Sequence, residues 1–180
     1  DQLRLVSAEE ASAIAGIPLT HEAFHIAGSG YVSPLKLTRA YLKGVDVRYG
    51  HPVRSLSDLA ADRVADRVVV ACAHAAQEFE ECAAIALQKV RGQVTATTAT
   101  EASARLRCCL HYGGYASPAV RGIHVIGASF QRWLDHTDLL PDDDRDNLTK
   151  LEAVAPGITA GMEPVSARAS LRATARDQVP

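Results

Sequence analysis

The first sixty residues alternate short apolar stretches with residues that favour turns. Residues 3–6 (LRLV) and 23–26 (AFHI) are short apolar stretches that predict two strands. Between them, Ser7 and Glu10 form a capping box, because each side chain can satisfy a free backbone N–H of the other. This pattern predicts a helix that ends at Gly16. A turn is expected at residues 28–30 (GSG).

A second helix is predicted to begin at Ser33-Pro34. Serine is a good N-cap, and proline is well tolerated at the first helical position. The helix carries an apolar stripe and is expected to end at Gly44, before a short strand at 45–48. The stripe consists of Leu37, Tyr41 and Leu42.

The middle of the chain contains a continuous apolar run. Residues 66–73 (DRVVVACA) are polar at first and then uninterruptedly apolar and β-branched. Such a run is typical of a strand buried on both faces of a parallel sheet. A helix is expected to follow through about Leu87, and residues 90–95 predict another strand.

The last eighty residues favour antiparallel strands and one helix. Residues 105–115 and 123–130 alternate in polarity and are separated by a loop that contains proline and glycine, which predicts an antiparallel hairpin. Asp144 can cap a helix that ends at Pro156-Gly157, and 165–174 predicts a final strand. One face of that helix is apolar, formed by Leu148, Leu151, Val154 and Ala155. The mixture indicates α/β and α+β character, with two domains sharing the chain.

Composition excludes several classes of protein. The 180 residues are 47% apolar and carry a formal charge of −2, so any RNA contact must be local or come from another domain. No apolar run approaches the roughly 20 residues of a membrane span, and no signal peptide is visible. Four cysteines without a C-x-x-C motif favour buried free thiols in a reducing cytoplasm. The abrupt ends are expected of a piece of a longer sequence.

A zinc-protease motif is present but unconvincing. His21, Glu22 and His25 match H-E-x-x-H, yet glycine and proline on both sides leave barely two helical turns. In a strand the two histidines would stand about 13 Å apart, too far for one metal ion. The position of the third ligand in the longer motif is Tyr31. We expect no metal site.

An acidic run at residues 142–146 invites a calcium interpretation. The sixth loop position, which requires glycine, is Asn147, and the twelfth, which requires glutamate, is Ala153. We therefore expect a solvated run at a helix N-terminus, where the helix dipole favours carboxylates.

Six segments together resemble a known family. They are AGSGYVSPLKLTRAYL, DRVVVACAHAA, KVRGQVT, HYGGYASPAVRGIHVIGASF, DNLTKLEAVAPG and RASLRATARDQVP, and they cover most of the chain. In this order they resemble the FAD-dependent amine and amino-acid oxidase superfamily, which includes D-amino-acid oxidase and glycine oxidase. The resemblance is greatest to the oxidoreductase half of the bacterial bifunctional proteins that build 5-methylaminomethyl-2-thiouridine at the tRNA wobble position.

The resemblance implies an FAD-dependent oxidation of a C–N bond, in which hydride passes to the flavin and water hydrolyses the resulting imine. Arg172 matches the arginine that binds the substrate carboxylate, and Tyr115 matches a tyrosine that reaches the same group. The implied partners are tRNA and a SAM-dependent methyltransferase domain in the same polypeptide. A small amino-acid or amine oxidase and a non-catalytic truncated module are the alternatives.

Other positions match segments that lie beside the cofactor. Gly30, Tyr31 and Pro34 resemble a wall at the flavin side. Arg91, Gly92 and Gln93 resemble a segment near the flavin ring. Asp177 and Pro180 begin the terminal motif that meets the cofactor in the family.

The implied fold is an antiparallel-rich substrate-binding sheet with flanking helices plus part of an FAD-binding domain. Segments 1–31 and 85–172 are expected to form the former, and 32–84 and 173–180 a remnant of the latter. The family's G-x-G-x-x-G fingerprint is missing, because Gly28-Ser29-Gly30 lacks the third glycine. We therefore expect the isolated chain to bind FAD weakly or not at all.

Overall fold

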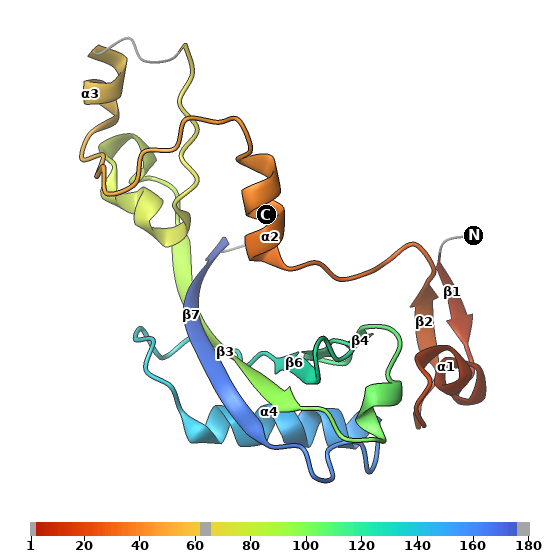
Figure 1. Cartoon of the computed structure of the whole chain (residues 1–180). Coiled ribbons are helices and arrows are strands. Elements are labelled where there is room, and N and C mark those ends of the chain that lie inside the picture. The colour runs from red at the N-terminus through yellow and green to blue at the C-terminus, as the bar shows by residue number, and fades with distance from the viewer. Residues whose placement is uncertain (1–2, 62–65, 176–180) are drawn as a thin grey trace. The chain divides into compact units, whose positions relative to one another are not determined.

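The computed structural model describes residues 3–61 and 66–175 (Figure 1). The chain divides into two compact units. The first contains Asp1–Tyr31, Arg91–Gln131 and His136–Ser170, and the second contains Val32–Val90, Arg132–Asp135 and Leu171–Pro180. The assignment of substrate binding and FAD binding to separate parts of the chain stays a prediction.

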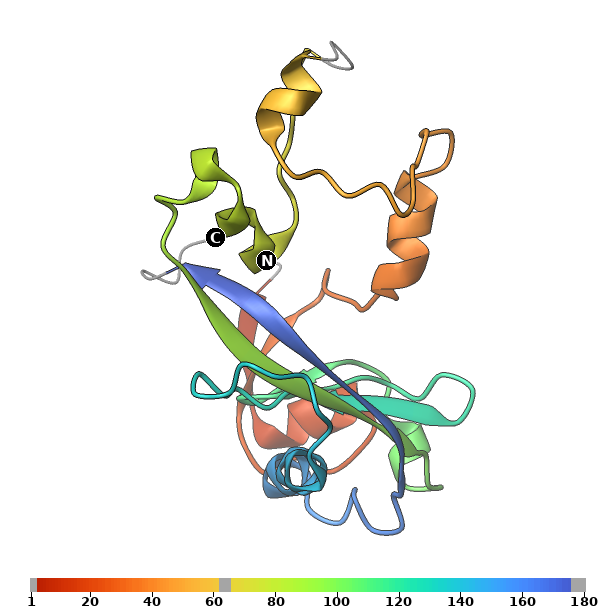
Figure 2. The same cartoon turned by 90° about the vertical axis from the view of Figure 1, so that its left-hand side faces the viewer.

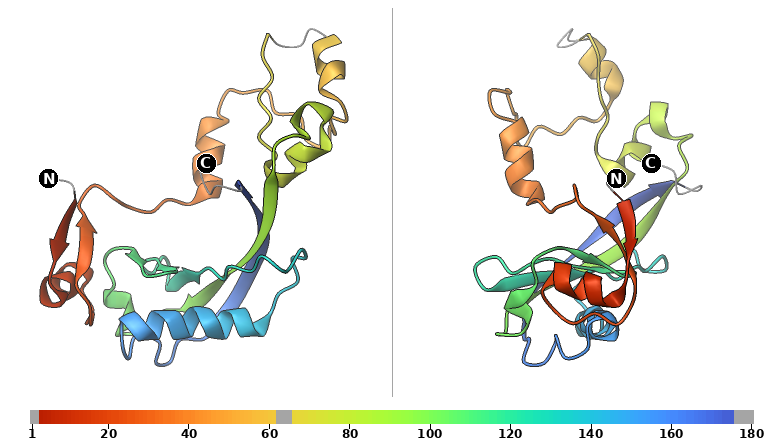
Figure 3. Two further views of the ribbon diagram at one scale, coloured as in Figure 1. Left: turned by 180° about the vertical axis from the view of Figure 1, so that it is seen from behind. Right: turned by 90° about the vertical axis from the view of Figure 1, so that its right-hand side faces the viewer.

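The first unit begins with a small antiparallel sheet that holds a helix. Strands β1 (Leu3–Val6) and β2 (Ala23–Ile26) pair, and α1 (Ala8–Ala15) lies between them in the sequence (Figure 3). The Glu10 backbone N–H donates to Ser7 Oγ over 3.2 Å, which confirms the predicted cap. The Glu10 carboxylate instead pairs with Arg4, at 2.5 Å.

A five-stranded sheet with the order β4-β5-β6-β3-β7 forms the centre of the first unit. Strands β3 and β6 pair antiparallel, as do β5 and β6. The predicted hairpin is confirmed only in part: β5 pairs with β6, but residues 105–115 do not form one strand, because β4 pairs with β5. Its first strand is shorter than predicted, because Leu106 turns into the core and the Arg107 N–H donates to the Ala15 carbonyl over 2.9 Å. The strands are β3 (Leu87–Thr98), β4 (Leu110–His111), β5 (Tyr115–Ala116), β6 (Ile123–Gly127) and β7 (Pro164–Ala175), with a 3-10 helix, η3 (Ser103–Arg105), before β4.

One helix, α4 (Pro141–Val154), lies along a face of this sheet (Figures 1 and 2). Its Leu151 packs in the core against Ile126 of β6. The expected cap at Asp144 is wrong: the helix begins at Pro141, and Asp144 lies in its first turn. The rest of the core comes from α1, the following loops and the segment after α4, and includes Ala15, Ile17, Leu106, Ala116, Ala155, Ile158 and Met162.

A buried ion pair joins α4 to β3. Arg91 is fully buried, and its Nη1 donates to Asp143 Oδ2 and to Gln131 Oε1, each over 2.5 Å. Its Nη2 donates to Gln93 Oε1 over 3.0 Å and to the Asp138 carbonyl. Gln131 Nε2 donates to the other oxygen of Asp143, so one carboxylate holds two segments in place.

Gln93 and Thr95 extend this network along β3. Gln93 exchanges two hydrogen bonds of 2.9 Å with the backbone of Leu140, and its Nε2 also donates to Asp144 Oδ1. Thr95 donates to the same oxygen over 2.6 Å, and Asn147 Nδ2 donates to Thr95 Oγ1 and to the Gln93 carbonyl. The expectation that the whole acidic run is solvated is therefore wrong for Asp143 and Asp144. Both carboxylates are acceptors for side chains of β3.

The second unit differs most from expectation. Helix α2 (Pro34–Tyr41) is capped by Ser33 as predicted, but residues 45–48 are not a strand. The apolar run at 68–72 is irregular, and Val69 is 86% exposed, so the predicted buried strand is wrong. A strand buried on both faces needs neighbouring strands, and the described part of this unit offers only the ends of β3 and β7. The expected helix through Leu87 is replaced by two 3-10 helices, η1 (Ala73–Glu78) and η2 (Glu80–Cys82), which follow α3 (Leu56–Ala61).

The four cysteines are free thiols, as predicted, but the expectation that they are buried is wrong: Cys72 is exposed and the other three are half-buried. Across residues 3–61 and 66–175, no helix has the length and apolar character that crossing a bilayer requires.

We predict that Asp143→Ala destabilises the chain by about 3–5 kcal/mol, because it leaves the buried Arg91 guanidinium without its counter-ion. The matched control is Asp146→Ala, in the same helix, which removes only a half-exposed pair with Lys150 and should cost less than about 1 kcal/mol. Urea denaturation followed by circular dichroism measures both. Equal losses for the two variants would show that the buried pair adds nothing beyond a surface one.

Candidate functional site

Tyr115 lies on the sheet face opposite α4. Its neighbour Ala116 is buried in the core with Ile126, and successive side chains of a strand point to opposite faces. Tyr115 pairs with Gly127, and Gly127 pairs with Val94, so the three residues form one row across β5, β6 and β3. A Cβ at Gly127 would lie 3.1 Å from the Val94 Cα, so this glycine lets two strands approach closely.

A second tyrosine, Tyr112, is hydrogen-bonded to the backbone of Tyr115. The Tyr112 hydroxyl donates to the Tyr115 carbonyl over 3.2 Å. Burial, and to a lesser extent the Tyr115 phenol, raises the pKa of Tyr112 far above its ordinary value. Tyr112 therefore stays protonated and remains a donor to the backbone of β5.

Arg172 lies on β7 and is exposed. It belongs to the second unit, whereas Tyr115 belongs to the first. The predicted clamp of these two side chains on one carboxylate stays a prediction.

Of the three residues expected near the flavin ring, Arg91 and Gln93 differ from Gly92. Arg91 and Gln93 are bonded to each other and to α4 or the loop before it, so their side chains are occupied within the protein. Gly92 stands between them, on the opposite face of the strand from their side chains, and it is buried in the described structure. Any approach of this segment to a ligand would therefore use the Gly92 backbone. That role stays a prediction.

The expected flavin-side wall is open to solvent. A Cβ built at Gly30 meets no atom within 4 Å, and Tyr31 is exposed. Pro34 is the first residue of α2. Asp177 and Pro180 lie outside the described residues.

The H-E-x-x-H segment is not helical. His25 lies within β2, opposite Arg4, and His21 lies in a bend with its Nδ1 2.8 Å from Thr20 Oγ1. Among the residues whose structure is described, no three His, Cys, Asp or Glu side chains gather closely enough to hold a metal ion.

One buried histidine is structural. His124 of β6 places Nδ1 2.8 Å from the Ser117 carbonyl and Nε2 3.0 Å from Ser103 Oγ. Both ring nitrogens are therefore engaged by loops of the first unit, on the face that α4 covers. This histidine fixes loop positions rather than facing a ligand.

A shallow pocket of about 420 Å³ lies beside the second half of α4. Its charged residue, Glu152, accepts hydrogen bonds from the Thr159 hydroxyl and the Gly157 N–H, which lower the pKa of the carboxyl. This carboxylate closes the turn after the helix. The pocket contains none of the predicted site residues; its lining is Leu148, Thr149, Glu152, Ala153 and Thr159.

Sequence reasoning missed the partners of Arg91. Asp143 and Gln131 stand 52 and 40 positions from it, and no local pattern connects them. The available signal was the acidic run itself, since carboxylates inside a helix beside a strand arginine can be buried partners as well as solvated groups.

Comparison with known proteins agrees with the resemblance. A family model for FAD-dependent oxidoreductases matches residues 1–180. The chain is 33% identical to the tRNA 5-methylaminomethyl-2-thiouridine biosynthesis bifunctional protein MnmC of Pseudomonas putida (strain W619) and 30% identical to that of Chromobacterium violaceum. Each match covers 99% of this chain and 30% of the relative, so the chain spans less than a third of their length.

A solved structure shows the same fold. Glycine oxidase from Geobacillus kaustophilus superimposes with a TM-score of 0.73 at 19% identity, over 99% of this chain and 53% of the oxidase. The expected D-amino-acid-oxidase-like fold is thereby confirmed. The chain belongs to the FAD-dependent oxidoreductase family.

Proposed function

We propose that the chain is part of an FAD-dependent oxidoreductase that acts on the C–N bond of a carboxymethylaminomethyl group on the tRNA wobble uridine. The observation that carries this proposal is the 30–33% identity, over nearly the whole chain, to proteins of tRNA 5-methylaminomethyl-2-thiouridine biosynthesis. The parent polypeptide would also carry the dinucleotide-binding segment and a SAM-dependent methyltransferase domain.

The substrate group dictates what the protein must bind. It contains a secondary amine and a carboxylate, and FAD supplies the oxidation of the C–N bond by accepting hydride. The carboxylate requires a fixed donor, and the planar guanidinium of Arg172 can present two parallel N–H groups to it. The Tyr115 hydroxyl adds a third donor. These two residues orient the substrate.

The residues present fit part of the cofactor. A Cβ at Gly30 would meet no atom within 4 Å and Tyr31 is exposed, so this wall leaves space for a flat ring. Gly92, which lies between two anchored residues, is itself buried in the described structure. No G-x-G-x-x-G loop occurs in the 180 residues, so the pyrophosphate has no helix N-terminus prepared for it. The chain therefore fits the ring and lacks the cradle for the ADP half.

We predict that the purified chain forms no stoichiometric complex with FAD at micromolar concentrations. Because only ring contacts are available, riboflavin should bind as weakly as FAD. Titration followed by flavin fluorescence measures both ligands. A yellow stoichiometric complex that prefers FAD over riboflavin would show that a pyrophosphate site exists here after all.

We predict that, in the full-length flavoenzyme, Arg172→Lys lowers kcat/KM by about 100-fold and Tyr115→Phe by about tenfold, because each removes hydrogen bonds to a charged group. Arg168→Lys, at an exposed position on the same strand, is the matched control and should leave kcat/KM unchanged. Assays compare undermodified tRNA with glycine and other small amines. Turnover of small amines alone would replace tRNA as the substrate. Equal effects of Arg168→Lys and Arg172→Lys would remove the carboxylate role of Arg172.

A further inference from the structure

Positive charge gathers in one short part of the second unit. Residues 31–54, which we call the basic segment, carry five lysines and arginines and a single carboxylate, Asp46. The formal charge of this segment is therefore opposite in sign to the −2 of the whole chain. Every residue of the segment is exposed. Its cations are Lys36, Arg39, Lys43, Arg48 and Arg54.

Helix α2 carries its cations on the side opposite two of its apolar residues. At 100° per residue, Lys36, Arg39 and Lys43 fall within an arc of about 60°. Lys43 follows the last helical residue but continues the helical path, because its N–H donates to the Ala40 carbonyl over 3.3 Å. Leu37 and Tyr41 stand on the other side of the helix.

This division decides which face stays in solvent. Leu37 and Tyr41, which stand opposite the basic arc, are exposed in the described structure and favour cover by protein. A surface helix packed through those side chains turns its basic arc outward. The arc therefore remains available to a partner even after the apolar face is covered.

The cations of the arc form no ion pair with the residues that the structure describes. In the described residues, no ion pair includes Lys36, Arg39 or Lys43. By contrast, Arg48 pairs with Asp46 over 3.3 Å in the loop that follows. Three unpaired cations on one arc are suited to the closely spaced charges of a phosphate backbone.

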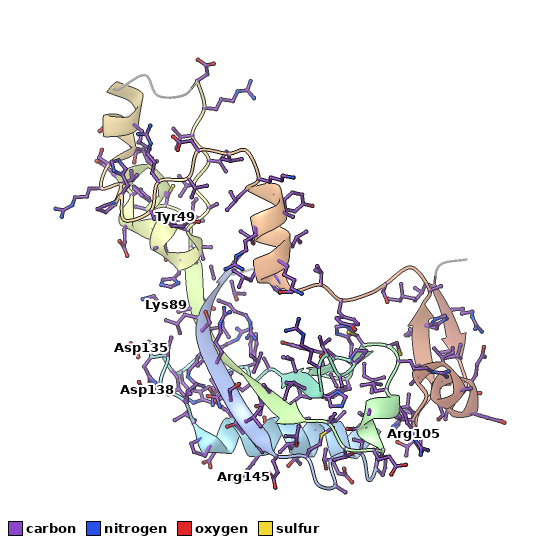
Figure 4. The ribbon with its side chains drawn as sticks, viewed as in Figure 1. Tyr49, Lys89, Arg105, Asp135, Asp138 and Arg145 are labelled. Atoms are coloured by element: carbon purple, nitrogen blue, oxygen red, sulfur yellow. The ribbon has the colours of Figure 1, made fainter. Side chains whose placement is uncertain are left out.

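An exposed aromatic ring lies just beyond the arc in the sequence. Tyr49 follows Arg48 and is 86% exposed (Figure 4). Single-stranded RNA loops splay out bases that stack on aromatic side chains, and the contact tolerates any base because each has a flat face. Basic side chains with a neighbouring exposed aromatic ring are characteristic of such surfaces.

We propose that the basic arc of α2, together with Tyr49, contacts the RNA of the tRNA substrate. Lys36, Arg39 and Lys43 bind backbone phosphates, and the Tyr49 ring stacks on a base of the single-stranded loop. This proposal rests on the proposed function, which supplies tRNA as the partner. A basic amphipathic helix can also bind an anionic membrane, but a helix of two turns buries little apolar area in a bilayer.

The test measures binding of a fluorescein-labelled tRNA anticodon stem-loop to the chain by fluorescence anisotropy over a range of salt concentrations. The triple variant Lys36→Gln, Arg39→Gln, Lys43→Gln should lower affinity at least tenfold and reduce the slope of log K against log salt by about 2, because up to three phosphate contacts are lost. Tyr49→Ala should weaken binding about tenfold without changing the slope, because stacking releases no counter-ions. Glutamine is a good helix former, and circular dichroism confirms that α2 is retained.

A second triple variant, Arg105→Gln, Arg145→Gln, Lys150→Gln, is the matched control. It removes the same number of positive charges from the first unit, where each side chain already pairs with a carboxylate, namely Glu101, Asp142 and Asp146. The affinity of this control should stay within about twofold of the wild type, and the slope of log K against log salt should not change, because paired cations release few counter-ions. Two of these control positions, Arg105 and Arg145, are labelled in Figure 4.

The outcomes separate this proposal from the proposed function. Equal losses in the two triple variants, or no binding by the wild-type chain, would overturn the RNA-binding surface, while the activity of the full-length enzyme on tRNA would still stand. Conversely, a full-length enzyme inactive on tRNA would overturn the proposed function even if the stem-loop binds. Binding to vesicles of phosphatidylserine and phosphatidylcholine, lost in the α2 variant and without RNA binding, would assign the arc to a membrane instead.

Discussion

The buried pair of Arg91 and Asp143 is the constraint on which the first unit depends. A guanidinium buried away from solvent is tolerated only when its N–H groups have hydrogen-bond acceptors. The Arg91 guanidinium donates to the Asp143 carboxylate and to three further acceptors, which are the side chains of Gln93 and Gln131 and the Asp138 carbonyl. The acceptors come from β3, the segment after β6 and the start of α4. One charged group therefore holds three separate parts of the chain together, and Arg91 Nε is its one buried N–H without a partner among those described.

This constraint assigns the two faces of the sheet to different tasks. The face that contains Arg91, Gln93 and Thr95 is filled by polar contacts with α4 and has no room for a ligand. Under the proposed function, the chemistry would use the opposite face, where Tyr115 stands. A residue that resembles a cofactor contact can thus serve by anchoring its neighbour, since adjacent residues of a strand face opposite ways.

The second unit shows the same separation on a helix. Helix α2 bears its cations on the side opposite Leu37 and Tyr41, so a nearly neutral chain can still present a local positive surface. Apolar side chains at Val68 and Val69 are also exposed, and the run that contains them lacks neighbouring strands. The matched relatives are more than three times as long as the chain.

The sequence by itself determined the features that depend on a few adjacent residues. The cap at Ser7, the start of α2 at Ser33-Pro34 and the strand at 23–26 follow from hydrogen bonds and periodicity within one or two turns. The resemblance added the family and the candidates Arg172 and Tyr115, whose joint role remains a prediction. Only the tertiary structure decided that Asp143 is buried, that α4 begins at Pro141 and that the apolar run at 68–72 forms no strand. Each of these depends on partners distant in the sequence: a carboxylate is buried or solvated, and an apolar run is paired or exposed, according to what the rest of the fold brings beside it.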